Sequence, residues 1–484
     1  PPLWPHQQEG LDHVRELRGA FCAMGCGTGK TRVIVERIAD LVRSNLERRC
    51  VLIFCPKAVV DTWSGQIDEW LEPDVRDQIL VTAARKSSIT KRLATIRKDN
   101  VTTLRDGRVH VVVINYESTR NEDLRRWLMS QTWSLVVCDE SQSIKAHNSK
   151  QSKFIAKIDA LQRVCLTGTP TPHSPLDHFG QMRFLTGGGQ GWTRFVPFRS
   201  RYAIEVQLGG SGIKKITGFR NLDELERKLA PYFYQVKASD VLDLPGVEHV
   251  RRSVELSSKE RKAYDGVMNE LFTLADSGVP IVASNVLDRL LKCQQITGGG
   301  VKVTDEVTRD ERRVVLGHTK REELVQILSE IPEDEPVAVF ARFRHDLDEI
   351  AAAASDAGRG VLELSGRRDD LATWKEASGG EVLAVQIQSG GAGIALTRSA
   401  RVVYWSVGFS LGDYEQSLAR AHRPGQTRVV QYFHLTARDT IDELIYRALS
   451  ARRDLVEESL QHVRDHSERR RSLTRGAVPE AHRA

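Results

Sequence analysis

Short, uninterrupted hydrophobic runs recur along the chain and alternate with stretches that have a helical period. In the first part of the chain the runs are VLIFC (51–55), VVVI (111–114), LVVC (135–138) and VCL (164–166), and in the last part VAVF (337–340), VLEL (361–364), VLAV (382–385), VVYW (402–405) and VVQYF (429–433). Such runs are typical of strands buried on both faces of a parallel sheet. The stretches between them, such as 31–47, 321–331 and 345–357, have the period of amphipathic helices. The alternation predicts an α/β fold of two tandem, doubly wound parallel-sheet lobes.

The region between the two groups of runs, about residues 171–335, changes to charged helical stretches with Gly-rich breaks. We therefore expect helical material inserted into both lobes. The predicted organisation is an N-terminal lobe over 1–236 with a helical insertion at 171–236, a linker at 237–249, a C-terminal lobe over 250–450 with a helical insertion at 250–335, and a basic tail at 451–484.

Composition and charge exclude some classes of protein without identifying a substrate. The chain has 484 residues, with 70 Lys and Arg against 64 Asp and Glu and a net charge of +6, which permits a polyanionic partner but does not require one. No apolar run approaches the roughly 20 residues that span a bilayer. The first residues, PPLWPHQQEG, lack the basic and apolar stretches of a secretory signal. We expect neither a membrane span nor secretion.

Cysteine usage indicates a reducing compartment. The chain has seven cysteines, an odd number, with no CxxC pair and no histidine cluster at zinc spacing. Most lie in or beside apolar segments, which favours small buried thiols over disulfides or a metal site. We expect a cytoplasmic protein.

A glycine-rich segment, GCGTGKT (25–31), lies directly before an amphipathic helical stretch. Such a turn presents backbone N–H groups to a phosphate, Lys30 adds a positive charge for the β- and γ-phosphates, and Thr31 can hold Mg²⁺. Met24 stands where the strict GxxxxGK pattern has glycine, so the match is to the looser GxGKT form. A glycine-rich helix start without a ligand remains the alternative for this segment taken alone.

A pair of carboxylates follows the buried run 135–138. Asp139 can hold Mg²⁺ through water, and Glu140 can accept a proton from the attacking water. An isolated Asp-Glu is usually a solvated loop, but strand ends are where doubly wound sheets present ligand groups, so together with GTGKT the pair predicts an ATPase. LTGTP (166–170) follows another buried run and could report nucleotide state, although alone it is a simple turn.

The last part of the chain contains the basic segment QSLARAHRPGQ (416–426). Arg420 and Arg423 are i, i+3 neighbours, so both guanidinium groups can reach one side of a helix. Arginines supplied by a second domain stabilise the charge that develops in phosphoryl transfer. The alternative is a solvated basic helix end.

The order of these motifs resembles that of the superfamily-two helicases and, within them, the Swi/Snf-type DNA translocases. The segments that carry the resemblance are WPHQQEGL (4–11), GCGTGKT (25–31), CPKAVVDTW (55–63), INYE (114–117), DESQSIKAHNSK (139–150), LTGTPTPHSPLD (166–177), VFARFRHDLD (339–348), QSGGAGIALT (388–397) and QSLARAHRPGQ (416–426). The resemblance implies two RecA-like lobes, ATP and Mg²⁺ as cofactors, and a DNA-dependent ATPase that moves along duplex DNA.

The resemblance also implies roles for individual residues at matching positions. Adenine would be read by Gln7, while ATP phosphates and Mg²⁺ would be bound by Gly27, Thr28, Gly29, Lys30 and Thr31, with Asp139 and Glu140 as the metal-binding and water-activating carboxylates. In the second lobe, Arg420 and Arg423 would be the arginine fingers and Gln416 would line the nucleotide side. DNA contacts would come from Pro56, Lys57, Trp63, Arg342, Ser389 and Gly390.

Three positions depart from the family pattern: Met24, His173 and Ala395. None removes a phosphate-contacting or catalytic group, so they indicate a divergent branch of the family. The inserted helical region is too short for an additional reader domain, so we expect a minimal motor of bacterial or viral type. We expect sequence-independent binding of double-stranded DNA by a monomer, with no membrane partner. The motifs leave two alternatives open, a strand-separating DNA or RNA helicase and an ATP-switched DNA-binding module.

Overall fold

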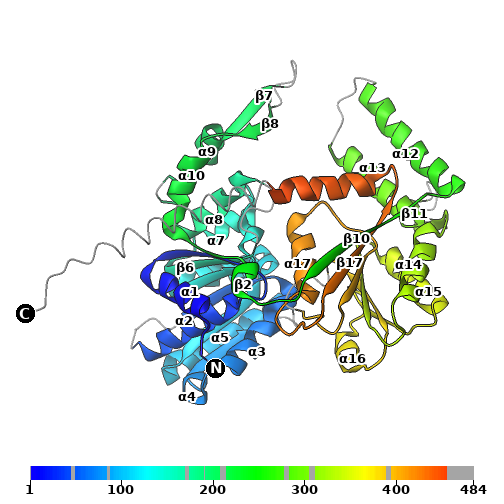
Figure 1. Cartoon of the computed structure of the whole chain (residues 1–484). Coiled ribbons are helices and arrows are strands. Elements are labelled where there is room, and N and C mark those ends of the chain that lie inside the picture. The colour runs from blue at the N-terminus through cyan, green and yellow to red at the C-terminus, as the bar shows by residue number, and fades with distance from the viewer. Residues whose placement is uncertain are drawn as a thin grey trace, which may run out of the picture. The chain divides into compact units, whose positions relative to one another are not determined.

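The computed structural model describes residues 2–44, 50–83, 88–168, 174–189, 191–207, 214–276, 283–304, 311–388 and 394–454. The chain divides into two compact units, unit 1 from Pro1 to Leu242 and unit 2 from Asp243 to Arg452. Each unit is built on its own large parallel sheet, and the two sheets can be followed in Figure 1. The predicted α/β class with two tandem RecA-like lobes is thus confirmed.

The sheet of unit 1 has seven strands, and each pairs with its neighbours in parallel. Their order is β3 (Ile79–Ala83), β4 (Val109–Asn115), β2 (Cys50–Cys55), β5 (Trp133–Asp139), β6 (Ala160–Thr167), β1 (Gly19–Met24) and β9 (Phe233–Val236). Asp139 is in register with Leu166, and Ala23 with Thr167. Because the strands are parallel, the segments that follow β1, β5 and β6 all leave from the same edge of the sheet.

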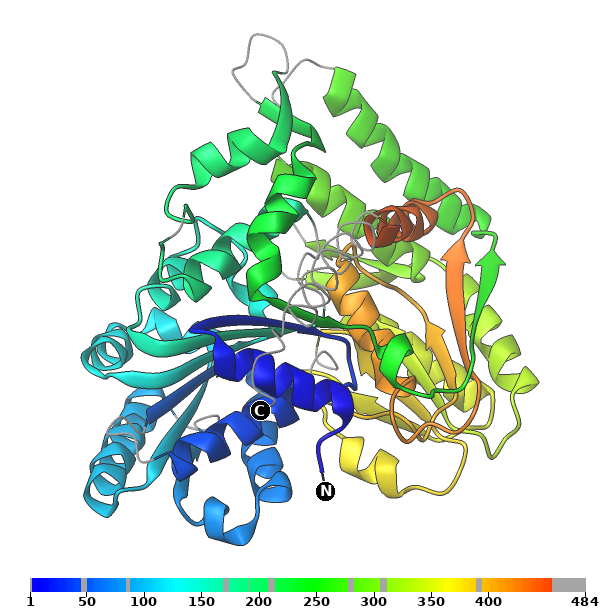
Figure 2. The same cartoon turned by 60° about the vertical axis from the view of Figure 1, so that its left-hand side comes forward.

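Helices cover both faces of this sheet, as Figure 2 shows. On one face α1 (Pro5–Glu16), α2 (Lys30–Arg43) and α3 (Val60–Trp70) pack in sequence, with α4 (Pro73–Arg76) beside α2. The other face forms a continuous apolar core with α5 (Ile89–Asp106), α6 (Glu122–Ser130), α7 (Lys150–Ile155) and α8 (His178–Leu185). Burial on both faces explains why the strands are uninterrupted hydrophobic runs.

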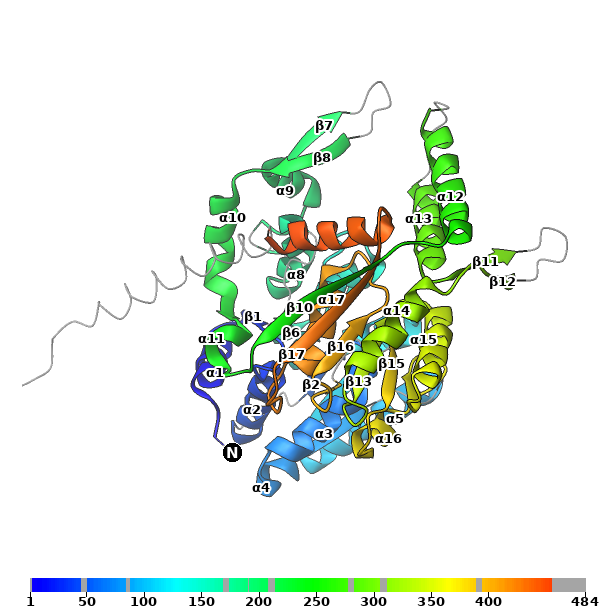
Figure 3. The same ribbon diagram turned by 45° about the vertical axis from the view of Figure 1, so that its right-hand side comes forward.

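The insertion predicted at 171–236 is not wholly helical. It contains α9 (Phe195–Tyr202) and α10 (Leu222–Leu229), but β7 (Ala203–Gln207) and β8 (Lys214–Phe219) form an antiparallel hairpin between them, and β9 joins the main sheet. The hairpin is a separate two-stranded sheet that extends away from the seven-stranded one (Figures 1 and 3). The stretch AIEVQ alternates apolar and polar residues, and this period of two is the signal for β7.

The sheet of unit 2 has six strands, again all parallel. Their order is β10 (Val247–Val254), β17 (Val430–Ala437), β16 (Arg401–Tyr404), β13 (Val337–Ala341), β15 (Val382–Gln386) and β14 (Val361–Leu364). Figure 3 shows α14 (Thr319–Glu330) and α15 (Arg344–Asp356) along one face of this sheet, where their apolar side chains form the core. The arginine-bearing segment forms α17 (Leu411–Ala421), and α16 (Leu371–Glu376) follows β14.

The segment predicted as a helical insertion at 250–335 also contains strands. Long helices α12 (Ser258–Asp276) and α13 (Ala283–Thr297) are present, but β10 precedes them and β11 (Gly300–Thr304) pairs with β12 (Glu311–Val315) in a second hairpin. The division between the units falls inside the predicted linker 237–249, which holds the short helix α11 (Ala238–Val241) and the first residues of β10.

The end of the chain continues as a helix over 441–454, and residues 455–484 of the predicted tail lie outside the described residues. In the ranges that the structure describes, no helix combines the length and apolarity needed to cross a membrane.

Candidate active site

The glycine-rich segment forms a tight turn between β1 and α2. Gly27 and Gly29 have φ angles of 82° and 85°, in the left-handed region that glycine adopts without strain. Thr28 closes the turn by donating its hydroxyl to the Gly25 carbonyl at 2.8 Å. Gly29 is the N-cap of α2 and provides no side-chain hydrogen bond to the first helical turn. A helix start of this kind, followed at once by Lys30, is a site at which an anion can serve as the cap.

The side chain of Gln7 lies directly on this turn. Its Nε2 donates to the Thr28 carbonyl at 3.1 Å, and its Oε1 accepts from the Trp4 backbone N–H at 3.1 Å. A Cβ on Gly29 would come within 2.2 Å of the Gln7 Nε2, so this close approach requires glycine at position 29. The structure therefore brings Gln7 together with the loop, while its adenine-reading role stays a prediction.

The turn is also joined to the last strand of the sheet. The Gly25 backbone N–H donates to the Val236 carbonyl at the end of β9, at 2.9 Å. A Cβ on Gly25 would lie 2.9 Å from the backbone nitrogen of Ala238. The loop is thus packed against the segment that leads out of unit 1.

The two adjacent carboxylates stand at the end of β5, on the edge of the sheet that carries the loop. Asp139 is buried; its Oδ2 accepts from the Trp63 indole N–H at 3.1 Å and its Oδ1 from the Glu140 backbone N–H at 3.0 Å. Burial, and then the charge of Glu140, raise the pKa of Asp139 to about 7, against the opposing effects of Lys30 and the two hydrogen bonds. Asp139 is therefore held where a cation would stabilise its charged form.

Glu140 adopts an unusual backbone conformation. Its φ and ψ are 50° and 57°, in the left-handed region that costs a non-glycine residue conformational energy. The side chain reaches the phosphate loop, with its Oε1 4.0 Å from the Lys30 Nζ. The structure thus brings Lys30, Asp139 and Glu140 together, as the motif spacing predicts.

A glutamine that the sequence did not single out orients Glu140. Gln142 donates its Nε2 to the Glu140 Oε2 at 2.9 Å, and its Oε1 accepts the Thr167 hydroxyl at 2.8 Å. Thr167 is the Thr of the LTG turn at the end of β6, so one amide connects both segments. The signal in the sequence was its position two residues after Glu140, on the short turn that follows the strand.

The oxygen donors near the loop suit Mg²⁺. Thr31 supplies a hydroxyl and Asp139 a carboxylate, both hard ligands, and a magnesium ion usually completes its shell with water and substrate phosphates. Within the described residues no group of three or more His, Cys, Asp or Glu forms a cage able to hold a metal without substrate. Burial raises the pKa of Asp139, and a bound cation would stabilise the charged form of this carboxylate. These residues therefore fit Mg²⁺ bound with a nucleotide.

The residues predicted to contact DNA differ in burial and in whether the structure describes them. Trp63 has no solvent exposure and its indole N–H bonds to Asp139, so the predicted DNA-contact role of Trp63 is wrong: its aromatic ring fills the core between α3 and the sheet. Pro56 precedes a short 3₁₀ turn (Lys57–Val59), on which Lys57 is exposed. Ser389 and Gly390 lie outside the described residues.

In unit 2, α17 and its exit bring the predicted arginines together. Arg420 is buried, and it and Arg423 each donate an Nη1 to the same backbone carbonyl, that of Ile394, at 3.5 and 3.1 Å. Gln416 lies one helical turn before Arg420 and is also buried. His422, between the arginines, has its Nε2 2.8 Å from the Pro245 carbonyl, so it donates to the first residues of unit 2.

Arg342 follows β13 and is held by a polar cluster rather than standing free in solvent. Its Nη1 donates to the Gln294 Oε1 at 2.7 Å, and its backbone N–H donates to the Ser406 hydroxyl at 2.8 Å. Ser406 in turn donates to Asp346 at 2.6 Å. Burial lowers the pKa of Arg342 from its usual value. The structure therefore fixes Arg342 at the carboxyl end of the sheet, and its contact with DNA stays a prediction.

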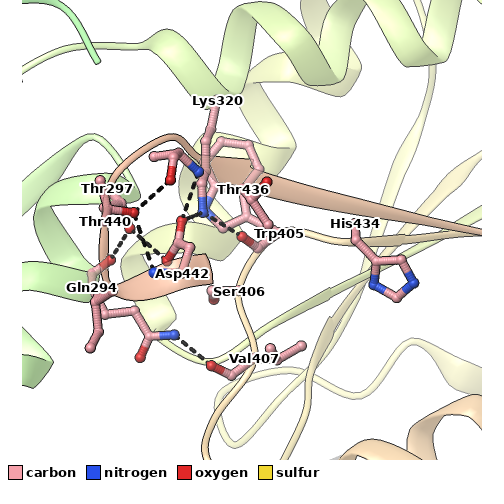
Figure 4. A network of polar contacts seen from close by, with 12 residues as sticks. Gln294, Thr297, Lys320, Trp405, Ser406, Val407, His434, Thr436, Thr440 and Asp442 are labelled. Carbon is pink, nitrogen blue, oxygen red and sulfur yellow. Dashed lines mark hydrogen bonds and ion pairs between the residues drawn. The ribbon is translucent and has the colours of Figure 1, made fainter. Parts of the chain in front are cut away.

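Figure 4 shows the neighbouring part of this network, which surrounds a buried ion pair. The Lys320 Nζ lies 2.7 Å from Asp442 and donates to the Trp405 carbonyl at 2.9 Å. Thr297 donates to the other oxygen of Asp442 at 3.1 Å. The network joins α13, α14, the end of β16 and the helix over 441–454. It therefore stabilises the segment after β16 that contains Ser406, the residue that bonds to Arg342.

Comparison with known proteins places the chain in a family. The SNF2-related domain matches residues 6–297. Protein p41 of Acyrthosiphon pisum secondary endosymbiont phage 1 is 25% identical over 94% of this chain and 98% of that protein. An uncharacterized ATP-dependent helicase of Mycoplasma pneumoniae is 21% identical over 94% of this chain but only 42% of that protein, so the chain spans less than half of this relative.

Among solved structures, the Sulfolobus solfataricus SWI2/SNF2 ATPase core in complex with dsDNA is 22% identical and covers 96% of this chain and 94% of that one, with a TM-score of 0.42. The family match alone extends over more than half of the residues and includes both the phosphate loop and the carboxylates of unit 1. The resemblance drawn from the motifs is confirmed, and the chain belongs to the SNF2-related family.

Proposed function

We propose that this chain is an ATP-driven DNA translocase, which hydrolyses ATP to ADP and phosphate and couples the reaction to movement along duplex DNA. The single observation that carries the proposal is the arrangement of Lys30, Asp139 and Glu140 at one edge of the unit 1 sheet, with Glu140 held by Gln142. Family membership supports it, as do relatives that are named as ATP-dependent helicases.

Unit 1 binds the nucleotide and activates the water that attacks the γ-phosphate. The backbone of the Gly27–Gly29 turn and the Lys30 ammonium bind the phosphates. Thr31 and Asp139 would hold Mg²⁺, which neutralises phosphate charge when it is bound. Glu140 takes the proton of the attacking water, and Gln142 keeps its carboxylate in place through the second bond to Thr167.

Unit 2 supplies the positive charge that the transition state requires. Arg420 and Arg423 both donate to the Ile394 carbonyl, so the two guanidinium groups lie together, and the charged oxygens of a transferring phosphoryl group are stronger acceptors for them than a neutral carbonyl. Because ATP binding then involves both units and ADP has no γ-phosphate for the arginines to hold, each cycle alternates between two conformations.

We propose double-stranded DNA as the partner, bound through its phosphate backbone and therefore without sequence preference. Lys57 is exposed beside Pro56, and Arg342, Ser389 and Gly390 are the proposed contacts of unit 2. We further propose that the chain acts as a monomer in the cytoplasm, which agrees with the free cysteines of the described residues.

The test is ATP turnover measured in parallel with no nucleic acid, duplex DNA, single-stranded DNA, forked DNA and RNA. Duplex DNA should stimulate turnover, and Lys30→Ala should abolish it, because the variant loses the charge that binds the β- and γ-phosphates. DNA-stimulated turnover that persists in Lys30→Ala would contradict the assignment of the loop. Stimulation by RNA alone would contradict a DNA translocase, and displacement of a strand from the fork would favour a strand-separating helicase.

A further inference from the structure

One short part of unit 1 is rich in basic residues. Residues 191–207 and 214–220, here called the basic arm, contain six lysines and arginines and a single glutamate, an excess of five positive charges. The whole chain of 484 residues has a net charge of only +6. An excess of one sign in a short part of the chain creates a positive local potential, which attracts a polyanion.

The base of the arm is firmly anchored. Phe198 and Tyr202 of α9 are buried in the unit 1 core, with ring centroids 4.8 Å apart. Tyr202 donates its hydroxyl to Glu224 of α10 at 3.0 Å, and Arg201 forms an ion pair with the same carboxylate. A two-stranded hairpin is marginally stable alone, so this anchoring holds β7 and β8 in a fixed place away from the main sheet.

The basic residues of the arm fall into two sets. Arg199 and Arg201 are neutralised by ion pairs with Glu205 and Glu224. Arg194 and Arg220 are exposed, and among the described residues neither has a carboxylate partner; the Arg220 Nη2 donates only to the Ser200 carbonyl, at 2.7 Å. Two further lysines, Lys214 and Lys215, begin β8.

Exposed apolar side chains accompany these charges. Ile204 and Val206, two residues apart on β7, are 42% and 49% exposed. The exposure of both side chains means that the hairpin presents apolar surface beside its charges. Such a mixture suits nucleic acid, whose backbone offers phosphates to arginine and lysine and sugar edges to apolar atoms. The charge excess favours this occupant over a protein surface, which is mixed in sign.

We propose that the basic arm is a second DNA-binding surface, which grips the phosphate backbone of duplex DNA outside the motif segments of the two sheets. The proposal rests on the proposed function. An additional contact of this kind keeps the DNA bound while the contacts that change with nucleotide state are released. The arm should therefore set DNA affinity and its salt dependence, and leave the chemistry of hydrolysis unaffected.

The experiment compares two full-length variants with equal loss of charge. The arm variant is Arg194→Ala, Lys214→Ala, Lys215→Ala and Arg220→Ala. The matched control removes four exposed basic residues of α5: Lys91→Ala, Arg97→Ala, Lys98→Ala and Arg105→Ala. Affinity for a mixed-sequence duplex is measured at several salt concentrations, together with ATP turnover with and without that duplex.

The arm variant should bind duplex DNA at least tenfold more weakly at moderate salt. The slope of log affinity against log salt should fall by about 0.9 for each DNA phosphate that the variant no longer neutralises. Turnover without DNA should equal that of the unchanged chain, and the control should behave as the unchanged chain does throughout. Equal affinity and slope in both variants would overturn the proposal.

A second measurement does not depend on the stability of the arm variant. Benzoylphenylalanine replaces Val206, or, as a control of similar exposure, Met129 on α6, which is 46% exposed. Irradiation should crosslink duplex DNA at position 206 and not at position 129; no crosslink at 206 would overturn the proposal. If the unchanged chain itself neither binds duplex DNA nor is stimulated by it, the proposed function fails, which is a distinct result.

Discussion

A hydrogen bond between Trp63 and Asp139 connects a buried aromatic side chain of unit 1 to the edge of the sheet that carries the candidate site. The donor is an indole with no solvent exposure, and the acceptor is the carboxylate proposed to hold Mg²⁺. Trp63 is thus a positioning residue: it orients Asp139 and favours the charged form of a carboxylate that burial would otherwise neutralise.

Trp63→Phe keeps an aromatic ring but removes the donor, and should lower kcat about tenfold with a smaller change in the KM for ATP. The matched control is Trp133→Phe, since Trp133 is equally buried and donates its indole N–H to the Leu128 carbonyl at the same distance, 3.1 Å. Both variants should lose similar unfolding free energy. Steady-state kinetics and urea unfolding measure the two effects, and equal kcat values in both variants would contradict the positioning role.

Asp346 gives unit 2 a pH-dependent stability. It is fully buried, and burial raises its pKa to about 7, against the opposing effects of the Ser406 hydroxyl, the Lys320 charge and the Phe343 backbone N–H; Asp442 adds to the rise. The folded state therefore binds more protons than the unfolded state between about pH 4 and pH 7. Its stability should fall as pH rises through that window, by up to about 1.4 kcal/mol per pH unit.

Asp346→Asn should remove this dependence, because the amide does not titrate. Relative to the unchanged chain, the variant should become progressively more stable between pH 5 and pH 7, and the difference should then level off. Urea unfolding at pH 5, 6, 7 and 8 measures it. Parallel stability curves for the two proteins would show that the carboxylate keeps its charge in the folded state.

At the scale of elements, the buried pair of Lys320 and Asp442 fastens the start of α14 to the helix over 441–454. Lys320→Met leaves Asp442 buried without its partner, and should cost about 3–5 kcal/mol of the unfolding free energy of unit 2. The adjacent Arg321→Ala is the control, since Arg321 pairs with a half-exposed carboxylate, Asp356, and should cost about 1 kcal/mol or less. Similar losses in both variants would contradict a bracing role for the network.

The sequence could predict most of the strands whose environment is apolar on both sides, because their runs contain at most one polar residue, Glu in VLEL and Gln in VVQYF. It missed β1 (GAFCAM), which is rich in small residues, and β10 (VEHVRRSV), whose polar residues reflect its place at the edge of the unit 2 sheet. Both hairpins were missed within segments assigned to helices. Each of these segments becomes a strand because it pairs with a strand or packs against residues distant in sequence, and local periodicity contains no information about such partners.

Within the site, the residues proposed to act on the nucleotide could be predicted from the sequence, and the residues that hold them in place could not. Lys30, Asp139 and Glu140 follow from the chemistry of phosphate and water, which restricts residue type and spacing. Trp63 was assigned to DNA and Gln142 was overlooked, because their roles depend on packing between β5, α3 and the turn after the strand. Only the folded chain brings these elements into contact.

At the scale of the whole molecule, the proposed mechanism joins residues that lie far apart in the chain, Lys30 in unit 1 and the arginines of α17 and its exit in unit 2. Arg423→Ala should lower turnover by roughly 10³ while ATP binding is retained, since the arginine acts on the charge of the transition state. Arg428→Ala is the control, because Arg428 follows the same motif but pairs with Glu335 at 3.0 Å. Binding of a fluorescent ATP analogue and single-turnover hydrolysis separate the two steps, and an equal loss of affinity and rate in Arg423→Ala would contradict the finger role.

The hydrogen bond from His422 to Pro245 has a mechanical consequence. It fastens the first residues of unit 2 to the exit of the arginine helix, just as the bond from Gly25 to Val236 fastens the last strand of unit 1 to the phosphate loop. Between these two attachments, α11 ends at Val241 and the Leu242 backbone N–H donates to the Ala238 carbonyl at 2.9 Å, so only Asp243 and Leu244 lie between the bonded ends of the connection. In the proposed motor, each end of this two-residue connection is therefore tied to one of the two groups proposed to act on ATP, the phosphate loop and the arginine helix.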